Sequence, residues 1–103
     1  MLFLITMTHT AESCPGYDPE KLEEGIAALE KCESVAKELG VKTHFLLADV
    51  LGHTMYALVE TDSADALQRS FGESPFRQDY TVTPVGHLKD MIKQAKEMLS
   101  EKK

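Results

Sequence analysis

The chain has 103 residues, with 17 acidic and 11 basic side chains and a net charge of −6 at pH 7. This length suits one domain, so we expect residues 1–103 to fold as a single unit. Nucleic-acid binding needs clustered lysine and arginine to replace phosphate counterions. The acidic balance therefore argues against nucleic acid, and against an acidic membrane surface, as a partner.

The N-terminal stretch MLFLITMTHT is apolar, but it lacks a basic segment and is too short to span a bilayer. Short apolar runs of this kind are typical of buried strands, and we expect a cytoplasmic protein. The two cysteines, Cys14 and Cys32, form no CxxC motif, and two cysteines do not make a disulfide framework.

Alternation with a period of two predicts a first strand at residues 2–8, which becomes polar toward His9. A loop, TAESCPGYD, follows, and Asp18 and Pro19 are typical of the start of a helix. An apolar residue every three or four positions predicts that this helix continues to Gly40. The stripe consists of Leu22, Ile26, Leu29, Cys32, Ala36 and Leu39.

The stretch THFLLADVLGHTMYALVE predicts a hairpin, with strands at about 41–48 and 53–60. Within the first of these strands, simple alternation places Thr43, Phe45 and Leu47 on one face.

The remaining pattern predicts a second helix at about 64–71, a fourth strand at 80–85 and a third helix at about 87–100. Pro84 removes a donor from the strand ladder, which favours an edge position for the fourth strand. The third helix has a clear apolar stripe of its own.

The order βαββαβ with an extra C-terminal helix predicts an α+β fold, the ferredoxin-like sandwich. Right-handed crossovers and short connections favour a four-stranded antiparallel sheet in the order 4-1-3-2, with the first two helices on one face. The other face would remain apolar. We expect either the third helix or the sheet of a second subunit to cover it.

Several segments carry a resemblance to a known superfamily: the strand ending in MTHT, the turn and strand LGHTMYALVE, the helix DSADALQRSF and the final TVTPVGHLKDMI. Over about residues 1–95 the pattern resembles the dimeric α+β barrel superfamily, which pairs two ferredoxin-like sheets face to face. The resemblance implies a homodimer. Members include cofactor-free monooxygenases, muconolactone isomerases, haem-degrading enzymes, chlorite dismutases and ligand-binding regulatory domains, so it implies no particular catalytic residue.

The predicted topology brings the end of the first strand and the starts of the third and fourth strands to one end of the sheet. His9, His53 and Tyr80 should meet there, joined by Cys14 and Tyr17 from the loop after the first strand. Two imidazoles and a thiolate suit zinc, copper or iron, so we predict a metal site at His9, Cys14 and His53.

Alternatives remain open at these positions. A histidine could instead be an axial ligand of haem iron, and each cluster residue is also compatible with a plain strand or loop role. We expect His44, in the middle of a strand, and His87, after the fourth strand, to lie away from the site.

The leading functional prediction is a small-ligand or transition-metal binding protein with a polar site at one end of the sheet. The alternative is a cofactor-independent monooxygenase- or isomerase-like enzyme in which His9 or His53 is the general base. A third reading is a purely structural or interaction protein, so the residues leave open whether the chain is an enzyme. The expected ligand pocket is lined by Phe3, Ile5, Leu29, Phe45, Met55 and Phe71.

Overall fold

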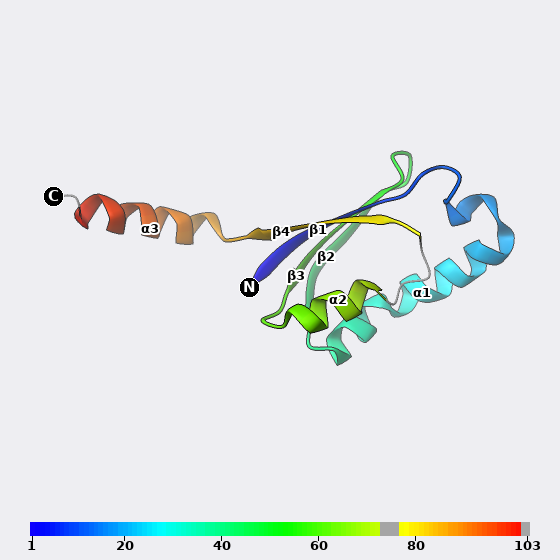
Figure 1. The fold of residues 1–103 in the computed structure, drawn as a ribbon, viewed down its shortest axis with the longest axis horizontal. Helices are drawn as coiled ribbons and strands as arrows, with labels where there is room; N and C mark the ends of the chain where they lie inside the picture. The colour runs from blue at the N-terminus through cyan, green and yellow to red at the C-terminus, as the bar shows by residue number, and fades with distance from the viewer. Residues whose placement is uncertain (73–76, 102–103) are drawn as a thin grey trace.

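A computed structural model describes residues 1–72 and 77–101 of the chain, in the predicted order of elements (Figure 1). The elements are β1 (Leu2–Thr8), the short 3-10 helix η1 (Pro15–Tyr17), α1 (Pro19–Glu38), β2 (Lys42–Asp49), β3 (Thr54–Glu60), α2 (Ala64–Gly72), β4 (Asp79–Val85) and α3 (Leu88–Glu101).

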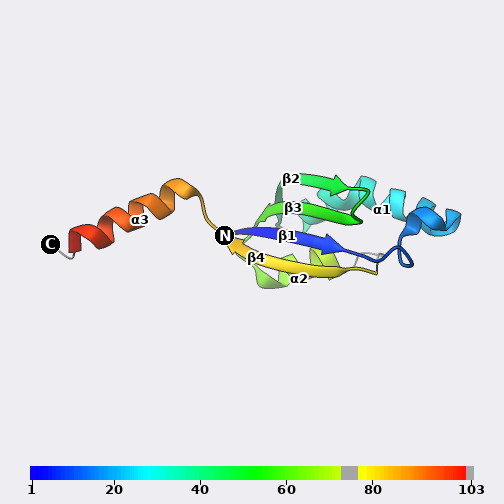
Figure 2. The ribbon, with the colours of Figure 1, turned by 90° about the horizontal axis from the view of Figure 1, so that it is seen from above.

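The four strands form one antiparallel sheet in the order β2-β3-β1-β4. This is the predicted order 4-1-3-2 read from the opposite edge, and β4 occupies an edge as Pro84 predicted. Helices α1 and α2 lie together on one face of the sheet (Figures 1 and 2). The α+β, ferredoxin-like prediction is therefore confirmed.

The core lies between the sheet and these two helices. Its largest fully buried side chains are Ile5 from β1, Val59 from β3 and Val41 just before β2. Ala36 from α1 and Leu67 from α2 close over them. The helix-facing side of β1 and β3, the two central strands, thus provides four of the eight core residues that are buried in the described part of the chain.

A β-bulge in β2 corrects the predicted faces of that strand. The register with β3 shifts between Thr43 and Phe45, so His44 is an extra residue and the alternation reverses beyond it. Leu46 consequently packs against the core. Phe45 and Leu47, 37% and 59% exposed, face the other side, and the prediction that Phe45 lines the pocket was wrong.

Only the second half of the α1 stripe packs against the core. Ala36 is buried, whereas Leu22 and Ile26 remain 41% and 49% exposed. The reason is positional: α1 begins beyond the ends of the strands and reaches the sheet only in its later turns (Figure 1).

Helix α3 extends away from the sheet, roughly continuing the direction of β4 (Figures 1 and 2). Within residues 1–72 and 77–101 it contacts no other element. We expected either α3 or the sheet of a second subunit to cover the other face of the sheet. In this chain α3 does not cover that face. Among the same residues, no helix combines the length and apolarity needed to cross a bilayer.

Candidate metal centre

The pairing of β1 with β3 brings two histidines together. Thr8 lies opposite Thr54, and the same register continues one residue beyond both strands. The backbone N–H of His9 donates to the carbonyl of His53 at 3.2 Å. The two rings meet edge to face, with centroids 5.2 Å apart and planes at 73°.

The turn before β3 holds His53 in an unusual backbone conformation, with φ of 52°. Two hydrogen bonds stabilise the turn: Gly52 N–H donates to Asp49 Oδ1 at 3.0 Å, and the Thr54 hydroxyl donates to the Gly52 carbonyl at 2.9 Å. The left-handed region costs a residue with a Cβ about 1–2 kcal/mol. The turn therefore holds the His53 ring in place against its local preference.

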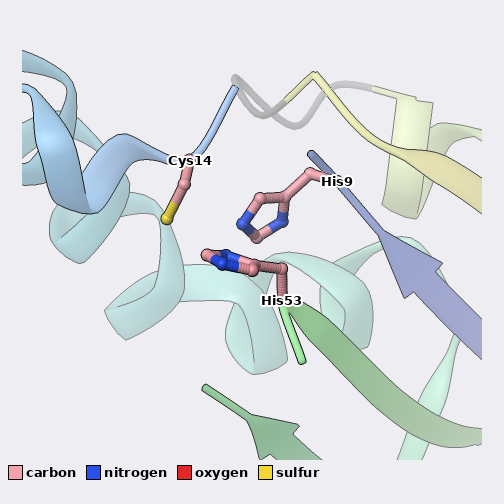
Figure 3. Close-up of side chains that lie close together, drawn as sticks. All are labelled: His9, Cys14 and His53. Carbon is pink, nitrogen blue, oxygen red and sulfur yellow. The ribbon is translucent and has the colours of Figure 1, made fainter. Parts of the chain in front are cut away.

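The loop after β1 supplies the thiol. Cys14 N–H donates to the carbonyl of Ala11, and the Cys14 carbonyl accepts from Tyr17 N–H, both at 3.3 Å. These bonds turn the chain so that the Cys14 side chain lies beside the two imidazoles (Figure 3). The Tyr17 ring lies near the same place, 6.5 Å from the His53 ring, as the topology predicted.

His9, Cys14 and His53 each offer one ligand atom, and these atoms lie within 4.8 Å of one another (Figure 3). A tetrahedral ion with bonds of about 2.0–2.3 Å holds its ligand atoms roughly 3.3–3.8 Å apart. Closing this cluster around an ion therefore requires movements of about 1 Å, within reach of side-chain rotation. All three residues are half-buried.

The His9 imidazole has the electrostatics of a ligand or a base. Its Nε2 atom is buried and has no hydrogen-bond partner among the described residues. Burial, and then the nearby His53, lower the pKa of His9 below its ordinary value of 6.5. The lowered pKa favours the neutral ring, the state that can bind a metal or accept a proton.

The Tyr80 hydroxyl, expected near the two histidines, forms its hydrogen bonds with residues outside the cluster. It donates to the carbonyl of Phe71 at 3.0 Å and accepts from Gln78 Nε2 at 3.1 Å. These contacts tie β4 to the end of α2. The tyrosine is thus occupied by a structural role that its position in the sequence did not reveal.

The other two histidines lie elsewhere, as expected. His44 Nε2 lies 2.8 Å from Glu60 Oε1, and this hydrogen bond lowers the pKa of the Glu60 carboxyl. The His87 carbonyl accepts the N–H groups of Asp90 and Met91, which begin α3 at the other end of β4.

A cavity of about 250 Å³ lies between the sheet and the two helices. Met7 and Met55 line it, and each is two residues from a cluster histidine along its strand. Of the predicted pocket residues, Leu29 and Phe71 also line it, as does Cys32, whose thiol pKa is raised by burial. The cavity and the cluster are therefore neighbours on the helix-facing side of the sheet.

No curated protein matches this sequence. The crystal structure of SCO4226 from Streptomyces coelicolor A3(2) is similar, with a TM-score of 0.51 and 20% sequence identity. The match covers 82% of this chain and 99% of SCO4226, and at that identity it shows the fold alone. The family described as a domain of unknown function, DUF3303, matches residues 1–99. Since that match spans nearly the whole sequence, the chain belongs to the DUF3303 family.

Proposed function

We propose that this protein binds a transition-metal ion through His9, Cys14 and His53. The observation that carries the proposal is the convergence of three ligand atoms within 4.8 Å, one of the side chains having a buried nitrogen without a partner. Buried polar atoms are nearly always satisfied, so an orphaned imidazole nitrogen calls for an explanation. A metal ion bound at this cluster would supply one.

The donor set narrows the choice of ion. Two imidazoles and one thiolate suit zinc, copper or iron. Three protein ligands would leave a fourth position for water or a substrate, as in catalytic zinc sites. Haem suits the surroundings less well, because the adjoining cavity of about 250 Å³ is smaller than ordinary cofactor pockets. A reducing cytoplasm would keep the Cys14 thiol available as a ligand.

Metal content and affinity test this proposal. Untagged protein should hold close to one transition-metal ion per chain by elemental analysis, and the metal-free protein should bind Zn²⁺ in a calorimetric titration. Cys14→Ser, His9→Gln and His53→Asn should each weaken Zn²⁺ affinity by roughly 100-fold or more. Asparagine is chosen at position 53 because it tolerates the left-handed backbone there.

The chain offers matched controls of the same residue types. Cys32 and His44 lie outside the cluster, so Cys32→Ser and His44→Gln should bind Zn²⁺ as the wild type does. A wild-type protein that takes up no stoichiometric ion would contradict the proposal. So would control variants that lose affinity as strongly as the cluster variants.

A second function is favoured by the neutral His9 ring beside the cavity. It is general-base catalysis of the cofactor-independent monooxygenase or isomerase type. Here His9 or His53 would take a proton from a small apolar substrate held against Met7 and Met55. In that case Zn²⁺ would occupy the same nitrogens and inhibit turnover, whereas in the first proposal it would be the native ligand.

Filling the cavity tests this second function. Ala28 lines the cavity and Ala27 next to it is exposed, so Ala28→Phe should displace a small ligand while Ala27→Phe should not. Native mass spectrometry of the purified protein would reveal a co-purifying organic molecule. A ligand that persists in Ala28→Phe would remove the cavity as its binding site.

A further inference from the structure

We propose that α3 of one chain packs across the open face of the sheet in a second copy, and reciprocally, so that two chains form a helix-exchanged homodimer. The open face is the side of the sheet opposite α1 and α2, and Figure 2 looks onto it, with both helices behind the strands. Two surfaces that lack a partner within the described residues carry this inference.

The first surface is α3 itself. An isolated helix of about 12–15 residues is marginal in water, and α3 has 14 residues and no contact with another element in the described ranges. Its large apolar residues lie on one stripe and are more than 40% exposed. They are Leu88 (67%), Met91 (58%), Ile92 (44%), Met98 (59%) and Leu99 (62%).

The second surface is the open face. Phe45, Leu47 and Tyr56 are 37%, 59% and 38% exposed there, and Val85 at the edge is 36% exposed. The strand register places them on one side, because Leu47 lies opposite Tyr56 in the β2–β3 pair. Contiguous exposed apolar patches on soluble proteins mark interaction sites.

The two surfaces match in size. A 14-residue helix is about 21 Å long, and a strand of seven residues spans about 23 Å. The helix therefore fits along the open face without overhang. Two such contacts, one in each direction, would bury an area on the order of the 1,200–2,000 Å² of a standard interface.

The two surfaces also match in charge. Residues 1–87 carry 14 acidic and six basic side chains, a net charge of −8, whereas residues 88–103 carry three acidic and five basic ones, a net charge of +2. Helical spacing places Lys89, Lys93 and Lys96 on one flank of the α3 stripe. Glu60, Asp79 and Asp49 lie at open-face positions of the register. The cation Lys42 lies on the same face, opposite Glu60, so the acidic side chains are in excess there. Opposite charges of this kind orient association.

The geometry of the connection explains why a second copy is needed. Only Gly86 and His87 separate β4 from α3, and α3 leaves the end of this edge strand pointing away from the sheet (Figure 1). An extended arm reaches the face of another chain without reversing its direction. Such a dimer differs from one in which two bare sheets pack face to face.

Oligomeric state as a function of concentration provides the test. Sedimentation equilibrium of the wild type should show a dimer. Ile92→Glu on the stripe and Leu47→Glu on the open face should each raise its dissociation constant by roughly 100-fold or more. Gln94→Glu adds the same charge to α3 off the apolar stripe and should leave dimerisation unchanged.

Mixing the two variants is the decisive step. Each variant alone has both contacts damaged, but a mixed dimer has one intact contact, between the α3 helix of the Leu47→Glu chain and the sheet of the Ile92→Glu chain. A contact that is already lost costs little more when it carries both substitutions, so mixing should restore part of the dimerisation. Circular dichroism checks that each variant is folded. Met98→Glu on α3 and Tyr56→Arg on the open face form a second pair for the same mixing experiment.

Three results would overturn the proposal. A wild type that stays monomeric at high concentration would show that no second copy is involved. A dimer broken by Leu47→Glu but not by Ile92→Glu would indicate direct sheet-to-sheet packing. A loss of dimerisation in both variants without rescue on mixing would show that α3 does not exchange between chains.

Discussion

At the scale of single residues, His9 is unusual because one of its ring nitrogens is buried without a hydrogen bond among the described residues. A buried polar atom left without a hydrogen bond costs about 1–3 kcal/mol, and His9 Nε2 is such an atom. A strand that merely ended in solvent would turn its last polar side chain outward. The inward position of this ring is what a ligand or a general base requires, and the proposed ion would remove the cost.

The lowered pKa of His9 predicts a pH dependence. Below pH 6.5, the ordinary value, the unfolded chain takes up a proton at this position before the folded chain does. Stability from this group is thus fully present above pH 6.5 and is lost as pH falls through the folded-state pKa. Zn²⁺ affinity should weaken over the same range, because protons compete for the imidazole.

Urea unfolding and Zn²⁺ titrations between about pH 8 and about pH 5 measure both effects. His9→Gln should flatten this part of the unfolding profile. An unfolding profile in which wild type and His9→Gln fall in parallel would show that another group is responsible.

The left-handed backbone at His53 predicts a second result. His53→Val should lower the free energy of unfolding by about 1–2 kcal/mol, because a β-branched residue is strained at a positive φ. His53→Asn should cost much less, although both variants remove the same imidazole. Urea denaturation in the presence of a chelator separates the backbone effect from any loss of metal, and equal destabilisation of the two variants would contradict it.

At the scale of elements, the end of α1 depends on one glycine. Gly40 has φ of 87°, and its N–H donates to the Lys37 carbonyl at 3.1 Å. No atom lies within 4 Å of an added methyl group, so the cost of Gly40→Ala is conformational. We expect a loss of about 1 kcal/mol in the free energy of unfolding.

Gly86 is the matched control for this prediction. It also has no atom within 4 Å of an added methyl group, but it does not lie in the left-handed region. Gly86→Ala should therefore be neutral or slightly stabilising in the same urea titration. If the two alanine variants unfold at the same urea concentration, crowding or another effect must outweigh the backbone conformation.

At the scale of the whole molecule, the proposed exchange of α3 predicts concentration-dependent protection from hydrogen exchange. In dilute solution the amides of α3 should exchange nearly as fast as in a free peptide, since a lone helix of this length is marginal. Protection across residues 88–101 should rise with protein concentration, while that of β1 and β3 stays constant. Protection of α3 that does not change on dilution would contradict exchange between chains.

The sheet and the cluster could be predicted because antiparallel pairing leaves little freedom. Once β1 and β3 are assigned, their register determines that His9 and His53 meet at one end. Pro84 likewise identified the edge strand. These conclusions depend on the number of residues between one position and the next, which can be counted in the sequence.

Other features depend on information that the spacing does not contain. The bulge at His44 inserts one residue into β2, and no glycine or proline in the sequence indicates it. Phe45 and Leu47 therefore lie on the face opposite to the one expected. The Tyr80 hydroxyl found its partner in the backbone of α2. The apolar stripe of α3 predicts a helix, but it does not predict where that helix lies relative to the sheet.

The pairing of Thr8 with Thr54 has a consequence for comparing sequences within this family. Side chains alternate between the two faces of a strand, so inserting or deleting a single residue within β3 would turn position 53 to the opposite side of the sheet. Such a relative would keep both histidines and the cysteine in its alignment and still be unable to assemble the cluster. The number of residues between each metal-ligand position and the buried residues of its strand should therefore be the same in a relative that shares the site. This is a stricter criterion than the presence of the two histidines and the cysteine.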